Sequence, residues 1–157
     1  MPNVLDAAEQ REVLEILGRH GSGRAAAVEA LKAVQARRGW VGDQALAGLA
    51  GALGLSAAEL DGLATAYPLI FRRPVGRHVI LLCDSLSCWI RGQEELLAAL
   101  RAQLGVGFGG TSADGRFTLL PAACLGACDR APAMMVDGDL HGPVEPGRLD
   151  AVLAAYL

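Results

Sequence analysis

Residues 78–92 read HVILLCDSLSCWIRG, and this stretch decides the fold. Its first part, His78 to Leu82, is a short apolar run with β-branched residues, which predicts a buried β-strand. Cys83 and Cys88 follow at once, with four residues between them. The cysteines therefore lie in a loop just past a strand end, where their thiolates can turn toward a common point.

A second cysteine pair repeats this arrangement further along the chain. Cys124 and Cys128 are separated by three residues and follow a second predicted strand, Arg116 to Leu120. Thiolates are soft donors that suit zinc or iron–sulfur centres. Structural zinc sites most often have two residues between cysteines, whereas wider loops fit a larger object. A [2Fe–2S] cluster takes two cysteines per iron, so one pair per iron is the favoured interpretation.

Three alternatives remain for the four cysteines. They can be small buried hydrophobic residues, ligands of one structural zinc ion, or a redox dithiol. The dithiol is disfavoured because the thioredoxin-type motif has two residues between its cysteines. The zinc alternative predicts a module that serves assembly only.

Elsewhere the sequence predicts a small helical bundle and an α/β domain. Amphipathic patterns and glycine stops indicate helices over residues 6–20 and 24–38. Asp43 is expected to cap a helix over 44–53, and Ser56 with Glu59 forms a capping box for a helix to about Ala66. After a proline- and glycine-containing linker come the strand at 78–82, a helix over 91–104, strands at 116–120, 133–136 and 140–141, and a closing helix over 145–157. Asp137-Gly138 predicts a hairpin turn. We place the domains at 1–73 and 74–157.

Composition limits the possible functions. Hydrophobic residues make up 52% of the 157, charged residues 20%, and the net charge is −3. The scattered basic residues argue against nucleic acid as a partner, and no apolar run approaches the roughly 18 to 20 residues that span a bilayer. The first residues resemble neither a secretory signal nor a transit peptide, so we expect a cytoplasmic protein without direct membrane insertion.

The cysteine segments also carry a resemblance. Residues 83–92, residues 114–121 (DGRFTLLP) and residues 124–138 (CLGACDRAPAMMVDG) resemble the ligand segments of the NuoE family, and the linker FRRPVG at 71–76 resembles that of the family. Thr65-Ala66-Tyr67 departs from the more frequent Thr-Phe-Tyr. The family is the thioredoxin-like [2Fe–2S] subunit of the NADH-dehydrogenase module of respiratory complex I.

The resemblance implies a thioredoxin-like [2Fe–2S] ferredoxin domain behind an N-terminal helical bundle. Cys83, Cys88, Cys124 and Cys128 would hold the cluster. It would exchange electrons with FMN on a partner flavoprotein subunit that oxidises NADH, alongside further iron–sulfur subunits, in a complex peripheral to the inner membrane. No residue of this chain is expected to be catalytic, and the chain alone is not expected to turn over NADH. The chain is also similar to the gamma subunit of NAD-dependent formate dehydrogenases and to a diaphorase subunit of NAD-linked hydrogenases.

Overall fold

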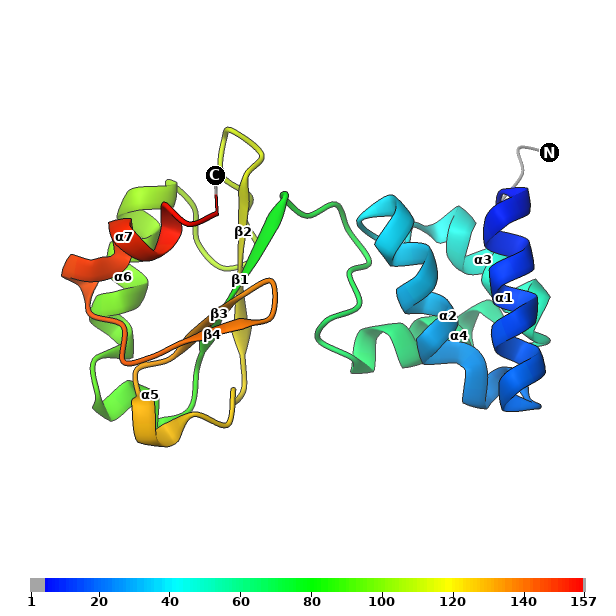
Figure 1. Ribbon diagram of the computed structural model, residues 1–157, viewed down its shortest axis with the longest axis horizontal. Coiled ribbons are helices and arrows are strands. Elements are labelled where there is room, and N and C mark those ends of the chain that lie inside the picture. The colour runs from blue at the N-terminus through cyan, green and yellow to red at the C-terminus, as the bar shows by residue number, and fades with distance from the viewer. Residues whose placement is uncertain (1–4, 157) are drawn as a thin grey trace. The chain divides into compact units, whose positions relative to one another are not determined.

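The computed structural model describes residues 5–156, which form two compact units divided between Pro74 and Val75. Figure 1 shows the first unit built from helices alone and the second from a sheet with helices. Residues 1–4, part of the expected first domain, and Leu157, part of the expected closing helix, lie outside the described residues.

The first unit is a bundle of four helices. These are α1 (Ala7–His20), α2 (Gly23–Arg38), α3 (Asp43–Leu53) and α4 (Ala57–Ala66). The expected capping box of α4 is confirmed, with Ser56 and Glu59 bonding reciprocally. The expected cap of α3 is wrong by one residue: Gly42 occupies the cap position, and Asp43 is the first helical residue. The carboxylate of Asp43 instead pairs with Arg72, 2.8 Å away.

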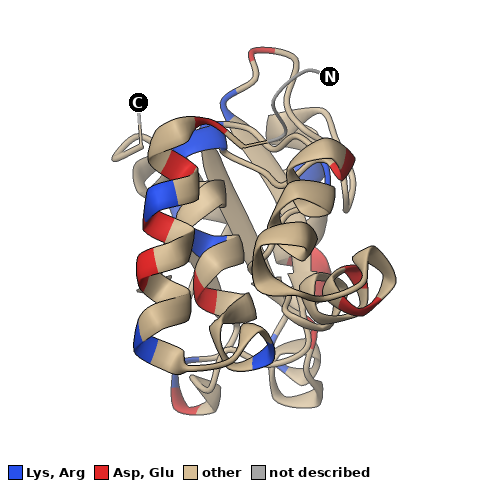
Figure 2. Cartoon of the chain, turned by 90° about the vertical axis from the view of Figure 1, so that its right-hand side faces the viewer, with Lys and Arg blue, Asp and Glu red and all other residues tan. Residues whose placement is uncertain are grey.

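Small side chains form much of the bundle core. Ala26, Ala27 and Ala30 of α2 are fully buried beside Leu31 and Leu49. Acidic and basic residues are interspersed along the outer surfaces of the helices (Figure 2), where they form exposed pairs such as Arg37 with Glu12. Such solvated pairs contribute little to stability, so burial of the apolar faces holds the bundle together.

The segment after α4 is bonded to the bundle. Arg72 donates to the carboxylates of Asp61 and Asp43 and to the carbonyl of Val41. Gln35 of α2 accepts from the Phe71 amide at 2.6 Å and donates to the Leu69 carbonyl at 2.8 Å. The predicted linker is therefore anchored through Arg72 before it leaves the first unit.

The second unit is a mixed four-stranded sheet with helices. Its strands are β1 (His78–Cys83), β2 (Phe117–Ala122), β3 (Met134–Val136) and β4 (Asp139–His141), in the order β2-β1-β3-β4. Its helices are α5 (Leu86–Ile90), α6 (Gln93–Leu104) and α7 (Leu149–Leu153), with 3-10 turns η1 (Cys128–Arg130) and η2 (Pro146–Arg148). β1 pairs parallel to β2 and antiparallel to β3, so β1 lies inside the sheet.

The predicted hairpin between β3 and β4 is confirmed. Asp137 and Gly138 both have positive φ, 53° and 114°, as a tight turn between antiparallel strands requires. The Asp137 carboxylate also accepts from the Val79 amide at 2.8 Å and bonds His78. The turn residue therefore also ties the hairpin to the start of β1.

Two helices differ from the sequence prediction. The helix expected over 91–104 begins at Gln93, because Gly92 adopts φ 98° and separates it from the short α5. The closing helix expected over 145–157 is a 3-10 turn followed by α7, which ends at Leu153.

No single helix among residues 5–156 is long and apolar enough to cross a membrane. Only α3 and α4 taken together meet the length and composition criteria, and they are bent by 113°.

Candidate iron–sulfur site

The parallel pairing of β1 and β2 brings both cysteine loops to one edge of the sheet. Cys83 is the last residue of β1 and lies opposite Ala122, the last residue of β2. Beyond that point the Asp84 amide donates to the Ala122 carbonyl at 2.7 Å. Cys124 follows two residues after β2, so the two predicted ligand segments begin side by side.

The first pair is buried. Cys83 is 2% exposed and Cys88 1% exposed. The short helix α5 carries Cys88, and the backbone bond from the Trp89 amide to the Ser85 carbonyl, 2.9 Å, closes its turn. The two cysteines pack against the small side chains of Ala127, Ala131 and Ala133, and those alanines come from the second loop and the segment after it.

The second pair is exposed. Cys124 and Cys128 are both accessible to solvent, and both are free thiols. Gly126 lies between them with φ 72°, and its amide donates to Cys124 Sγ at 3.3 Å. Cys128 begins the 3-10 turn η1. The loop therefore presents two sulfurs to solvent while it packs Ala127 against the buried pair.

Burial and neighbouring sulfurs act on the pKa of Cys88. Burial raises the pKa of the Cys88 thiol, and a hydrogen bond and the charge of Cys83 and the charge of Cys128 raise it further. The backbone N–H of Ala133 acts in the opposite direction. Thiolates gathered in this way repel one another. Metal ligation needs the deprotonated form, and the positive charge of a bound metal offsets the repulsion.

The residues present fit a two-iron cluster. Four soft sulfur donors from two loops, buried apolar packing on one side and backbone N–H groups near sulfur are what such a cluster requires. Within residues 5–156, no three His, Cys, Asp or Glu side chains lie close enough together to enclose a single metal ion.

Two backbone amides donate toward cysteine sulfur at this site. The Gly126 amide donates to Cys124 at 3.3 Å, and the Ala133 amide donates to Cys88. The glycine between Cys124 and Cys128 marks the Gly126 amide as a candidate donor in the sequence. Nothing in the local sequence marks the Ala133 amide.

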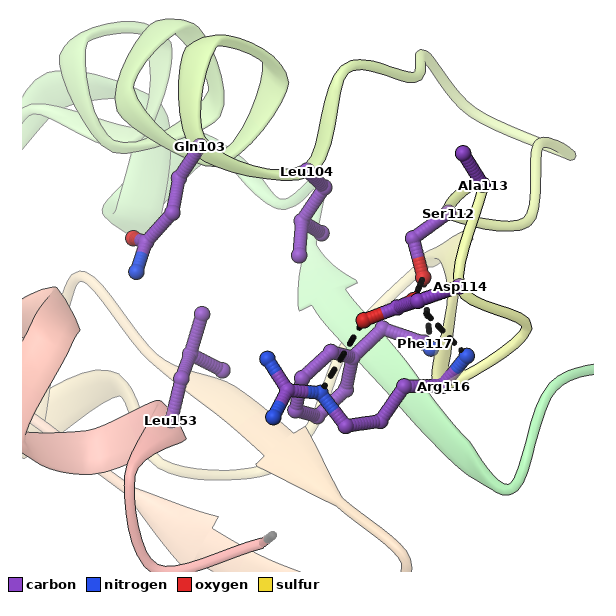
Figure 3. Close-up of a pocket in the computed structure, with 8 residues that line it drawn as sticks. All are labelled: Gln103, Leu104, Ser112, Ala113, Asp114, Arg116, Phe117 and Leu153. Atoms are coloured by element: carbon purple, nitrogen blue, oxygen red, sulfur yellow. Dashed lines mark hydrogen bonds and ion pairs between the residues drawn. The ribbon is translucent and has the colours of Figure 1, made fainter.

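A separate cavity lies at the other end of β2. It has a volume of about 260 Å³. Figure 3 shows Arg116 beside Phe117, with its Nε 3.5 Å from the Asp114 carboxylate. The cavity is lined by Gln103, Leu104, Ser112, Ala113, Asp114, Arg116, Phe117 and Leu153. None of the four cysteines lines it, so the sulfur site and this cavity are distinct.

Comparison with known proteins places this arrangement in a class. The family model of thioredoxin-like [2Fe–2S] ferredoxins matches residues 13–157. The chain is 48% identical over 154 residues to the E subunit of NADH-quinone oxidoreductase from Pseudomonas aeruginosa, covering 98% of this chain and 93% of that one. It is 47% identical over 152 residues to the Escherichia coli K12 protein of the same name, covering 97% and 92%. The chain therefore belongs to the thioredoxin-like [2Fe–2S] ferredoxins and, within them, to the NuoE family, the E subunits of NADH-quinone oxidoreductases.

A solved structure is also similar. The crystal structure of an NAD⁺-reducing [NiFe]-hydrogenase in the air-oxidised state matches with a TM-score of 0.68 and 29% sequence identity. The match covers 80% of this chain and 22% of the hydrogenase chain. The same fold thus occurs as one part of a much longer protein.

Proposed function

We propose that this chain is the electron-transfer subunit of an NADH-quinone oxidoreductase, in which Cys83, Cys88, Cys124 and Cys128 hold one [2Fe–2S] cluster. The observation that carries the proposal is that the two cysteine loops begin where two neighbouring parallel strands end. Family membership over nearly the whole chain supports it. In this proposal residues 74–157 form the redox domain, and residues 1–73 form a helical bundle that precedes it in the sequence.

When bound, such a cluster supplies one-electron redox chemistry. The chain's own residues would hold it, keep water from one side and present the other side outward. Cys83 and Cys88, packed among alanines, fix the inner side. Cys124 and Cys128 hold the accessible side. In this proposal the chain carries electrons and does not oxidise NADH itself.

The surface beside the site supports a protein partner there. Three large apolar side chains of α5, Leu86, Trp89 and Ile90, are 68%, 55% and 67% exposed around the buried Cys88. Clustered exposed apolar side chains mark interaction sites, and tryptophan is frequent among residues that dominate binding. We assign this surface to the NADH- and FMN-binding flavoprotein subunit, within a complex that holds further iron–sulfur subunits and lies peripheral to the inner membrane.

The ligand assignment is tested by iron and acid-labile sulfide analysis with electron paramagnetic resonance on anaerobically purified protein. We expect equal iron and sulfide in the full chain and loss of that signal in Cys124→Ser. Ala123→Ser, next to it on the same exposed loop, is the matched control and should keep the cluster. A colourless protein with one zinc ion per chain would instead establish the assembly module.

The partner assignment is tested by binding to the purified flavoprotein subunit. Trp89→Asp should weaken binding at least tenfold, because charge on a buried apolar contact is strongly unfavourable. Leu14→Asp changes an equally exposed apolar residue of α1, 58% accessible, and should leave binding unchanged. Equal affinity of both variants and the unmodified chain would remove α5 from the interface.

A second parent complex has specific support. The similarity to the NAD⁺-reducing hydrogenase shows the same fold in another NAD-linked enzyme, so a diaphorase role in a hydrogenase or formate dehydrogenase is the alternative. The identity of 47–48% over nearly full length to the two bacterial relatives favours the quinone oxidoreductase. Co-purification of the native chain with its neighbouring subunits decides between the two.

A further inference from the structure

Gly126 has an unusual position between the two exposed cysteines. Its φ is 72°, and its amide donates to Cys124 Sγ at 3.3 Å. A Cβ built on Gly126 would meet no heavy atom within 4 Å. Space therefore does not require glycine here, and the backbone conformation is the only structural requirement that a larger residue would violate.

The left-handed φ of Gly126 sets the course of the chain after its amide, so that the loop can bond Cys124 and still turn Ala127 inward. Residues other than glycine adopt this region only at an energetic cost, and asparagine is among the most tolerant of them. The turn at Gly126 aims one N–H at the sulfur of Cys124 while the next residue, Ala127, packs inward against Cys83 and Cys88. Because Ala127 is held in the buried cluster, a residue that leaves this conformation must tilt the preceding peptide plane, which moves the donor away from the sulfur.

We propose that Gly126 is a positioning residue that raises the reduction potential of the site through its amide bond to Cys124. This inference rests on the proposed function, because it needs Cys124 as a ligand. Reduction adds one electron, supplied by the partner in the complex or by dithionite through mediators in solution, and neither forms nor breaks a bond. The added charge falls partly on the ligand sulfurs, so an N–H donor stabilises the reduced state more than the oxidised state.

The test is a mediated potential titration of the full chain, monitored by electron paramagnetic resonance, with Gly126→Ala. We expect the potential to fall by an amount that makes reduction about tenfold less favourable, or about 59 mV for one electron. Gly115→Ala is the matched control. Gly115 has φ 70° and also leaves a Cβ without neighbours, but it lies before β2, at the opposite end of that strand from Cys124. The control should leave the potential unchanged.

A second variant keeps the test decisive if Gly126→Ala fails to fold. Gly126→Asn tolerates the left-handed conformation better and should give a potential between those of alanine and glycine. A potential and spectrum in Gly126→Ala or Gly126→Asn equal to those of the unmodified chain would overturn the inference, as would an equal fall in Gly115→Ala. If the unmodified chain holds no two-iron cluster, the proposed function fails instead, which the iron and sulfide analysis shows separately.

Discussion

Glu9 and Arg38 form an ion pair within the helical bundle. Glu9 of α1 is 2% exposed, and its carboxylate accepts from Arg38 Nε at 2.6 Å and Nη2 at 2.5 Å. The same carboxylate accepts from the Asp6 amide at 2.8 Å, which completes the capping box of α1. The pair therefore joins the start of α1 to the end of α2.

Arg38→Met should destabilise the bundle strongly at neutral pH. Methionine keeps an apolar stem but leaves the Glu9 carboxylate buried without its cation. Removal of one partner from a fully buried pair costs about 3–5 kcal/mol, and because the Arg38 side chain is 34% exposed we expect a smaller loss of about 2 kcal/mol. With a urea m value of about 2 kcal/mol/M, the unfolding midpoint should fall by about 1 M.

The effect should depend on pH in a defined direction. The hydrogen bond from Arg38 lowers the pKa of Glu9 below its usual 4.5, against the opposing effect of burial. A carboxyl group whose pKa is lower in the folded than in the unfolded state stabilises the fold above pH 4.5. This stabilisation is lost as the pH falls through the folded-state pKa. Without Arg38, burial raises the pKa of Glu9 instead. The difference in unfolding free energy between Arg38→Met and the unmodified chain should therefore be largest near pH 7. It should shrink as the pH falls below the pKa of Glu9 in the variant.

Urea unfolding followed by tryptophan fluorescence measures this effect. The chain has two tryptophans, Trp40 in the bundle and the exposed Trp89 in the other unit, so a Trp89→Phe background makes Trp40 report on the bundle alone. Arg37→Met is the matched control, because Arg37 pairs with Glu12 at the exposed surface and its loss should change the unfolding free energy little. A midpoint in Arg38→Met equal to that in Arg37→Met at pH 7 would refute the reasoning.

Three further predictions concern other contacts. Burial and a hydrogen bond to Asp139 raise the pKa of Tyr156 to about 12. The contribution of the protonated Tyr156 side chain to folding stability should therefore be lost as the pH rises from 10 toward 12. Tyr156→Phe should remove the tyrosine absorbance change near pH 12. Arg72→Ala should speed proteolysis after α4, because Arg72 holds that segment to Asp61 and Val41. Arg73→Ala should not, because the Arg73 side chain makes no hydrogen bond or ion pair within residues 5–156. Ser56→Ala should lower the stability of the bundle by about 1 kcal/mol through loss of the α4 cap, as measured by urea unfolding.

The elements that sequence predicted well are those with local signals. Glycine stops and capping residues fixed the ends of α1, α2 and α4, and the apolar run at 78–82 identified β1. The helix α5 was missed because five residues are too short to show a helical period. The buried position of Glu9 was also not predictable, because its partner Arg38 lies on another helix and the local pattern shows only an acid near a helix start.

The site shows the same division between local and long-range information. The four cysteines and their place after strand ends follow from spacing and hydrophobic pattern alone. The Ala133 donor does not, because Ala133 reaches Cys88 only through the antiparallel pairing that brings the start of β3 beside the end of β1. That pairing is visible in the bond from the Cys83 amide to the Ala133 carbonyl, 3.1 Å. Contacts across the sheet depend on strand order, which a single sequence does not specify.

Strand order also explains why one cysteine pair is buried and the other exposed. β1 lies inside the sheet, between β2 and β3, so Cys83 at its end has a strand on each side and is 2% exposed. β2 is an edge strand whose next-to-last residue is the exposed Pro121, and proline is tolerated at an edge because no further strand needs its missing N–H. The Cys124 loop continues from that edge toward solvent. If both pairs hold one cluster, its Cys124–Cys128 side is the one that faces solvent in the free chain.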